Sequence, residues 1–150
     1  MRALLAAVLI FGAGACGKKP VQTGTFAVIE TSMGTITVRL LTDKAPKTVA
    51  HFIGLATGKK QWRDPRNGAV RYEPLYDGAA FHRVVPGFMI QTGDPSGRGD
   101  GDIGYTIPDE VNAHKFLDGT LGMAKTSAPN SAGSQWFIDY APQTNLDGGY

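Results

Sequence analysis

The chain has 150 residues, 42% of them hydrophobic and 19% charged, which is the balance of one globular domain rather than of a disordered segment. Its formal charge of +2 comes from the N-terminus, because without Arg2, Lys18 and Lys19 the chain has 12 basic and 13 acidic side chains. This distribution excludes the basic surface of a nucleic-acid-binding domain. The scattered 20 glycines and 9 prolines exclude a coiled coil and a collagen-like chain.

The first fifteen residues are typical of an export signal. Arg2 precedes thirteen small or apolar residues, Ala3 to Ala15, a run shorter than the roughly 20 residues that cross a membrane. This pattern predicts a signal peptide over residues 1–15. Cys16, the only cysteine, follows at once, which resembles a bacterial lipoprotein signal and predicts lipidation of Cys16. Ordinary signal cleavage, which would give a soluble periplasmic protein, stays open as the alternative.

This interpretation divides the chain into three parts. Residues 1–15 form the signal, residues 16–24 form a lipidated cysteine with a polar tether, and residues 25–150 form the domain. The predicted localisation is the bacterial cell envelope, with the protein attached to the membrane through its lipid anchor alone and facing the periplasm or the outside.

The domain begins with two β-prone segments. Thr25–Thr31 is rich in β-branched residues, and Gly34–Leu41 alternates, with Ile36, Val38 and Leu40 on one face. Ser32-Met33-Gly34 lies between them, so the two segments predict a hairpin.

One amphipathic helix is expected next. Thr42 or Asp43 is the expected N-cap, Pro46 suits the first turn, and Gly58 suits the C-terminal end. The apolar stripe of this helix consists of Val49, Phe52, Ile53 and Ala56.

The remainder predicts short strands joined by polar loops. Residues 59–75 are polar and contain Asp64-Pro65-Arg66-Asn67-Gly68, so they predict a surface loop that can hold a small hairpin. Gly93–Gly104 is a long glycine- and aspartate-rich loop. The expected strands are Ala79–Val85, Phe88–Thr92, Leu121–Lys125 and Gln135–Ile138. Many short strands with one or two helices favour a mainly β domain, a closed antiparallel barrel.

Several chemical signals are weak. Asp94, Asp100 and Asp102 lie in one loop, but the glutamate that an EF-hand requires is missing. His51, His82 and His114 lack zinc-type spacing; we expect His51 to pack in the core and His82 to be structural. Ser134 has no nucleophile-elbow sequence around it. The sequence therefore predicts neither a metal nor another cofactor, and gives hydrolase chemistry no support.

The strongest signal is YDGAAFHRVVPGFMIQTGDP, from Tyr76 to Pro95. Its Phe81-His82-Arg83, Phe88-Met89 and Gln91 resemble the central signature of the cyclophilins, the barrel-shaped peptidyl-prolyl cis-trans isomerases. Two further motifs follow at that family's distances: Gly122-Met123-Ala124 leading to GSQWFI (133–138), and Leu146-Asp147-Gly148. The resemblance covers about residues 25–150, and three ordered motifs argue against a chance match.

This resemblance implies a fold, an activity and a site. It implies a cyclophilin barrel, eight-stranded in the full family domain and capped by helices, and peptidylprolyl isomerase activity (EC 5.2.1.8) without a cofactor. Arg83 takes the catalytic position. The implied substrate-binding residues are Phe88, Met89, Phe137 and Leu146 around the proline, Gln91 on the substrate backbone, Ala124 in the adjoining groove, and Tyr150. The implied partners are proline-containing unfolded or nascent exported polypeptides, and we expect a monomer.

The residue types suit this reaction. Amide resonance sets a barrier of about 18–20 kcal/mol to rotation, while the two isomers of an Xaa-Pro bond differ by only about 0.5–1 kcal/mol. A catalyst must therefore stabilise the twisted amide more than the planar one. Twisting makes the prolyl nitrogen an acceptor, and the guanidinium of Arg83 supplies donors. The strand period places Phe81, Arg83 and Val85 on one face, as it does Met89 and Gln91.

Three departures from the family pattern stand out. Asn145 replaces a tryptophan that many animal members use to contact cyclosporin, which predicts weak inhibition by that drug. Tyr150 stands where many members carry a substrate-contacting histidine. Family members also continue past Leu-Asp-Gly, so we expect that this chain lacks the last strands and second helix of the domain. Two other classes stay open: a non-catalytic module that binds proline peptides in the envelope, and a purely structural lipoprotein.

Overall fold

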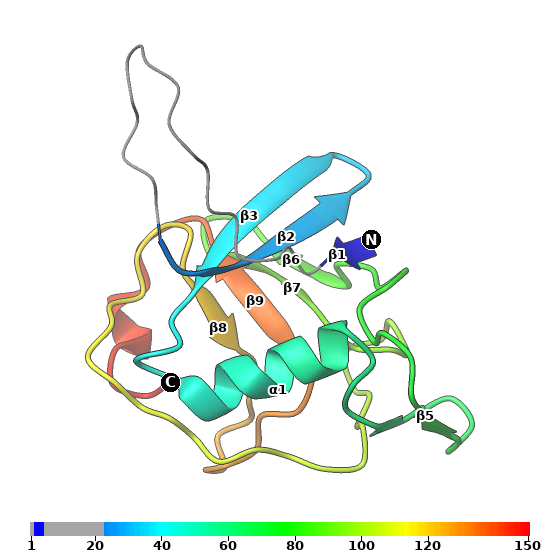
Figure 1. The fold of residues 1–150 in the computed structure, drawn as a ribbon. Coiled ribbons are helices and arrows are strands. Elements are labelled where there is room, and N and C mark those ends of the chain that lie inside the picture. The colour runs from blue at the N-terminus through cyan, green and yellow to red at the C-terminus, as the bar shows by residue number, and fades with distance from the viewer. Residues whose placement is uncertain (1, 5–22) are drawn as a thin grey trace.

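The computed structural model describes residues 2–4 and 23–150 (Figure 1). Most of the predicted signal segment, Cys16 and nearly all of the tether lie outside the described residues. The elements in chain order are β1 (Arg2–Leu4), β2 (Thr25–Thr31), β3 (Gly34–Leu40), α1 (Pro46–Ala56), β4 (Trp62–Arg63), β5 (Val70–Arg71), β6 (Arg83–Val85), β7 (Met89–Thr92), β8 (Leu121–Met123), β9 (Trp136–Asp139) and the 3-10 helix η1 (Thr144–Leu146). No helix among these described elements is long and apolar enough to span a membrane.

The described strands pair in three antiparallel groups. One sheet has the order β1-β2-β3, the β4–β5 hairpin stands by itself, and the third sheet has the order β6-β7-β9-β8. The expected hairpin of β2 and β3 is confirmed, with Thr25 opposite Leu40 and Thr31 opposite Gly34. The chain is mainly β with one α-helix, as predicted.

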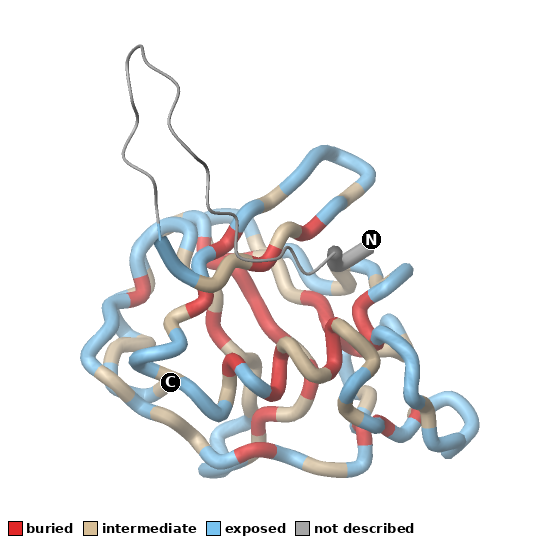
Figure 2. The backbone as a smooth tube through the Cα atoms, in the orientation of Figure 1, coloured by how far each residue is buried: buried red, intermediate tan, exposed pale blue. Residues whose placement is uncertain are grey.

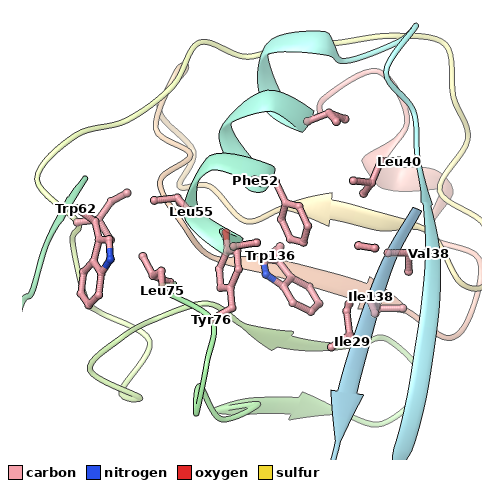
Figure 3. Packing of buried hydrophobic residues seen from close by; sticks show 14 residues of the cluster. Ile29, Val38, Leu40, Phe52, Leu55, Trp62, Leu75, Tyr76, Trp136 and Ile138 are labelled. Carbon is pink, nitrogen blue, oxygen red and sulfur yellow. The ribbon is translucent and has the colours of Figure 1, made fainter. Parts of the chain in front are cut away.

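The central core is the cluster of buried apolar side chains shared by the two larger sheets and α1 (Figure 3). Figure 2 marks the buried residues along the backbone. In Figure 3, Phe52 and Leu55 of α1 lie beside Tyr76 and Trp136. The alternation of β3 has the expected consequence, because Val38 and Leu40 are buried and Ile36 packs against them. The apolar stripes of helix and strands thus meet in one layer.

The beginning of α1 corrects the expected N-cap. Ala45 occupies that position and no side chain caps the helix locally, so neither Thr42 nor Asp43 has the predicted role. Instead, the carboxylate of Glu110 accepts hydrogen bonds from the backbone N–H groups of Lys47 (3.1 Å) and Thr48 (2.6 Å). The first backbone N–H groups of a helix have no acceptor within the helix. Glu110, more than 60 positions away in the sequence, provides the acceptor here.

Some predicted boundaries also differ. Ala79 to His82 is not a strand, and β6 begins at Arg83. β7 begins at Met89 rather than Phe88, β8 ends at Met123 rather than Lys125, β3 ends at Leu40, and β9 is shifted by one residue to Trp136–Asp139. These boundaries differ at strand ends. Residues there can have a high β-propensity and still lie outside a strand, because a turn ends the pairing with the neighbouring strand.

The polar segment 59–75 does form a small hairpin, β4–β5. Its turn is organised by Asp64, which is buried and accepts two hydrogen bonds from the guanidinium of Arg66 (both 2.8 Å) and one from Arg71 (3.3 Å). These bonds, led by Arg66, hold the pKa of Asp64 far below its usual range. The Nε1–H of Trp62 donates to the Glu73 carbonyl and so joins the two arms of this segment, while the buried ring of Trp62 packs in the central core.

Candidate functional site

A second apolar cluster lies on the opposite face of β9 from the central core. We call it the pocket cluster; its members are Met89, Phe116 and Phe137, which are buried, and Val85, Phe88, Ala124, Leu146 and Tyr150, which are partly buried. The alternation of β9 explains the separation, because Trp136 and Ile138 face the central core while Phe137 faces the pocket cluster. Six of the predicted substrate-binding residues therefore meet in one cluster, although they span more than 60 positions of the chain.

The pairing of β6, β7 and β9 arranges the site in rows. Arg83 is opposite Gln91, and Gln91 is opposite Phe137. Directly paired residues project to the same face of a sheet, so Arg83, Gln91 and Phe137 form one row there. The neighbouring row begins with Val85 opposite Met89. The predicted catalytic arginine thus lies beside the pocket cluster, and its side chain is exposed.

A chain of hydrogen bonds orients the polar side of the site. Arg83 Nη1 donates to Gln91 Oε1 (3.1 Å), Gln91 Nε2 donates to Gln135 Oε1 (2.8 Å), and Gln135 Nε2 donates to the Gly99 carbonyl (3.1 Å). Because each amide uses its oxygen as acceptor and its nitrogen as donor, the chain has a single direction. It leaves the remaining guanidinium donors of Arg83 available to a ligand.

The acidic loop supports this chain of bonds. Asp94 is buried, and its carboxylate accepts backbone N–H bonds from Ser96 (2.7 Å), Gly99 (2.6 Å) and Gly101 (3.0 Å). These bonds, with the Ser96 hydroxyl, outweigh burial and lower the pKa of Asp94. Asp94 therefore shapes the loop that presents the Gly99 carbonyl. In the described part of the chain, no three His, Cys, Asp or Glu side chains gather in a metal-binding group.

Aromatic rings form the wall of the pocket cluster. Phe116 and Phe137 are stacked with centroids 6.0 Å apart, and the ring of Tyr150 meets both edge-on at 5.7 and 5.8 Å. Gly122 makes room for the stack, because a Cβ there would lie 2.8 Å from Phe116 and 2.9 Å from Phe137. Sequence reasoning missed Phe116, which lies in a segment with neither helix nor strand periodicity, and it missed the role of Gln135.

Two ion pairs position the edge of the pocket cluster. Lys125 lies 3.0 Å from Asp109, with both side chains mostly buried, and its Nζ is 5.1 Å from the centre of the Tyr150 ring. Asp147 accepts a backbone bond from Phe116 (2.9 Å) and pairs with Lys115 (3.1 Å). The bond from Phe116 is the main reason that the pKa of Asp147 is lowered. Asp147 thereby links the segment that carries Leu146 to the wall.

Two cavities adjoin these residues. A groove of about 350 Å³ begins at Gln91, Ala124 and Gln135 and runs over residues 99–106. Ala124, which the resemblance implies in a groove beside the proline pocket, is one of its lining residues. A larger cavity of about 520 Å³ lies between β3, α1 and residues 107–125. Phe116 and Tyr150 of the pocket cluster line the larger cavity, whereas Gln91, the neighbour of Arg83 in its row, lines the smaller groove. Because Gln91 joins that groove to the row of Arg83, we place the candidate site at the pocket cluster and the smaller groove.

His51 and His82, for which the sequence predicts a packing or structural role, have different surroundings. His51 is buried, with Nε2 2.8 Å from the Gly133 carbonyl and Nδ1 2.9 Å from Lys60 Nζ. Burial lowers the pKa of His51, and the neighbouring Lys60 adds to the effect, so the ring is a neutral core group, as expected. His82 packs against Gly99.

Comparison with known proteins gives one consistent family. Residues 26–150 match the family model described as cyclophilin type peptidyl-prolyl cis-trans isomerase/CLD. Peptidyl-prolyl cis-trans isomerase B of Streptomyces anulatus is 43% identical over 124 residues, covering 82% of this chain and 71% of that protein. A peptidyl-prolyl cis-trans isomerase of Synechococcus elongatus is 44% identical over 124 residues, covering 83% and 74%.

Solved structures agree. The crystal structure of a cyclophilin-type isomerase of Cryptosporidium parvum, determined in the presence of the dipeptide Ala-Pro, superposes with a TM-score of 0.66 at 30% identity, covering 83% of this chain and 73% of that one. The chain belongs to the cyclophilin-type peptidyl-prolyl cis-trans isomerases. The expected fold family and enzyme class, peptidylprolyl isomerase, are confirmed.

Proposed function

We propose that this cyclophilin-type isomerase turns over Xaa-Pro bonds of exported polypeptides without covalent chemistry, and that Arg83 supplies the decisive hydrogen bond. The observation that carries the proposal is the row of Arg83, Gln91 and Phe137 beside a half-open apolar cluster. A proline ring needs an apolar seat, and the prolyl nitrogen needs a nearby donor. Both lie on one sheet face.

The apolar side of the site holds the substrate. The partly buried Phe88, Leu146 and Tyr150 border the buried Met89 and Phe137. A proline ring that covers them removes apolar surface from water, which favours binding by roughly 25 cal/mol for each Å² buried. The groove beside Gln91 and Ala124 takes the neighbouring part of the peptide chain. Holding both sides of the bond leaves rotation about the C–N bond as the motion that remains.

The polar side lowers the barrier. In the planar amide the nitrogen lone pair is delocalised, and in the twisted amide it is localised on nitrogen and accepts a hydrogen bond. An Arg83 N–H is such a donor, and the bond from Arg83 to Gln91 limits the positions that the guanidinium takes. The interaction therefore strengthens as the amide twists, which is the requirement for acceleration rather than mere binding.

The clients and the location follow from the N-terminus. Lipidation of Cys16 would hold the domain at the envelope surface through a short tether. Newly exported chains fold there, and their slow prolyl bonds limit folding. Mass spectrometry of the membrane-bound protein tests this location: a diacylglyceryl modification on Cys16 supports it, and an unmodified soluble form overturns it.

Arg83→Ala tests the mechanism. We expect kcat/KM for an Ala-Pro peptide to fall by about 10²–10³, the size of effect seen when a single transition-state donor is removed. Arg98→Ala is the matched control, because Arg98 is an exposed arginine outside the pocket cluster. Cis-trans exchange spectroscopy measures the rate, and circular dichroism checks folding. A folded Arg83→Ala variant with unchanged kcat/KM would contradict the mechanism; a folded parent without activity would favour the non-catalytic binding module.

A further inference from the structure

Asp139 is a buried carboxylate that the proposed mechanism does not use. It is the last residue of β9, and its exposed fraction is 0%. Neither carboxylate oxygen has a hydrogen-bond donor among the described residues. Burying a charge without a partner is costly, so such a group keeps its proton to higher pH. Burial raises the pKa of Asp139 to about 6.

The register places Asp139 in the site rather than behind it. Met89 is opposite both Val85 and Asp139, so the three side chains form a row on the same sheet face. The next row is Arg83, Gln91 and Phe137. Asp139 therefore lies in the same row as Met89, a buried residue of the pocket cluster.

The backbone around Asp139 is bonded to the pocket cluster on several sides. Its N–H donates to the Thr120 carbonyl (3.0 Å), and its carbonyl accepts from Gly119 (2.7 Å). The following residue, Tyr140, donates its N–H to the Phe88 carbonyl (3.1 Å) and its hydroxyl to the Val85 carbonyl. A displacement of this end of β9 would therefore also move Val85 and Phe88, two members of the pocket cluster.

The charged groups of the described elements packed against Asp139 donate no hydrogen bond to its carboxylate. β7 and β8 contain no ionisable residue. Residues 115–120 carry Lys115, which pairs with Asp147, and Asp118, which is exposed. On β6, Arg83 is engaged with Gln91. Burial is the cause of the shift at Asp139, and neighbouring charges do not contribute.

We propose that Asp139 is a positioning residue whose uncharged carboxyl keeps Met89 and Phe137 in the arrangement that binds proline, so that loss of its proton loosens the pocket. The carboxylate formed on ionisation requires water, and water reaches it only when the end of β9 shifts. That shift changes the seat of the proline ring and leaves the donors of Arg83 in place. This inference rests on the proposed function of the pocket cluster.

A pH profile of the full chain separates this role from a structural one. We expect KM for an Ala-Pro peptide to rise at least about threefold between about pH 5 and about pH 8, with kcat nearly unchanged. In Asp139→Asn, which is isosteric and uncharged, KM is expected to be independent of pH. Asp118→Asn, which removes an exposed carboxylate from the adjoining turn, should keep the parent profile. The same rise in KM in Asp139→Asn, or a flat profile in the parent, overturns the proposal.

A measurement on the unaltered chain covers the case in which Asp139→Asn fails to fold. Carbon-13 NMR follows the carboxyl of Asp139 and the methyl group of Met89 during the same titration. A shared midpoint near the raised pKa supports the coupling, and titration of the carboxyl in its ordinary range, or a Met89 signal that does not move, overturns it. This readout needs no turnover, so inactive protein with a coupled titration would contradict the proposed function and leave the positioning role intact.

Discussion

The central core and the pocket cluster share strand β9 and yet differ in kind. The core takes buried side chains from both larger sheets and α1, and Figure 3 shows them packed against one another. The pocket cluster has three buried members and five partly buried ones, several of them from loops. Enclosed apolar surface stabilises the fold, whereas apolar surface left half open is available to a ligand.

Trp136→Ala should destabilise the central core. Trp136 is 1% exposed and its ring meets Phe52, Tyr76 and Phe81 at centroid distances of 6.0, 6.1 and 5.9 Å. Removing a buried aromatic ring costs about 3–5 kcal/mol of the free energy of unfolding. Urea unfolding followed by circular dichroism measures the loss. A loss below about 1 kcal/mol would mean that this ring does not anchor the core.

Asp139→Asn should stabilise the chain, an unusual result for a substitution beside a binding site. In the folded chain the pKa of Asp139 is raised from 3.8 to about 6, so the folded state binds more protons between these values and the parent loses stability as pH rises through them. The gain from the substitution should be absent near pH 4 and reach about 1–3 kcal/mol at neutral pH. Thermal unfolding of both proteins across this range checks the sign, and a gain that is independent of pH would contradict it.

Leu146→Ala should separate activity from stability. Leu146 is only partly buried and belongs to the pocket cluster, so its truncation should lower kcat/KM about tenfold and change the free energy of unfolding by less than about 1 kcal/mol. Paired activity and urea measurements test this. Equal losses in a variant that unfolds readily would show that the pocket cluster is simply a second core.

The smallest expected effect is the pH dependence that His51 gives to the core. Its pKa is lowered by burial, so the unfolded chain binds more protons and the parent loses stability as pH falls below the usual histidine range. His51→Gln should reduce this loss, which we expect to match one hydrogen bond, about 1 kcal/mol. The comparison is best made in the Asp139→Asn background, because the ionisation of Asp139 lowers stability as pH rises, whereas protonation of His51 lowers it as pH falls. An unchanged slope would exclude His51 as its source.

Local pattern was enough for the regular elements. The alternation of Gly34–Leu40 and the stripe around Phe52 depend on neighbours within one strand or one helix turn, and both elements appear where the pattern indicated. The predicted boundaries were wrong at Ala79 to His82, because a β-prone stretch pairs only where a partner strand runs beside it. The residues of the pocket came from the resemblance to the cyclophilins, and their gathering in one cluster was then found in the structure.

By itself, the amino-acid sequence determined the hairpin, the helix and the motifs that identify the family, since these depend on residue type and short spacing. Only the tertiary structure decided that Glu110 caps α1, that Gln135 orients Gln91, and that Gly122 admits the Phe116–Phe137 stack. It also decided that Asp139 is buried on the face of the pocket. Most of these contacts join residues far apart in the sequence. Which residues meet at such a separation depends on how the sheets and loops pack, and no local sequence pattern determines it.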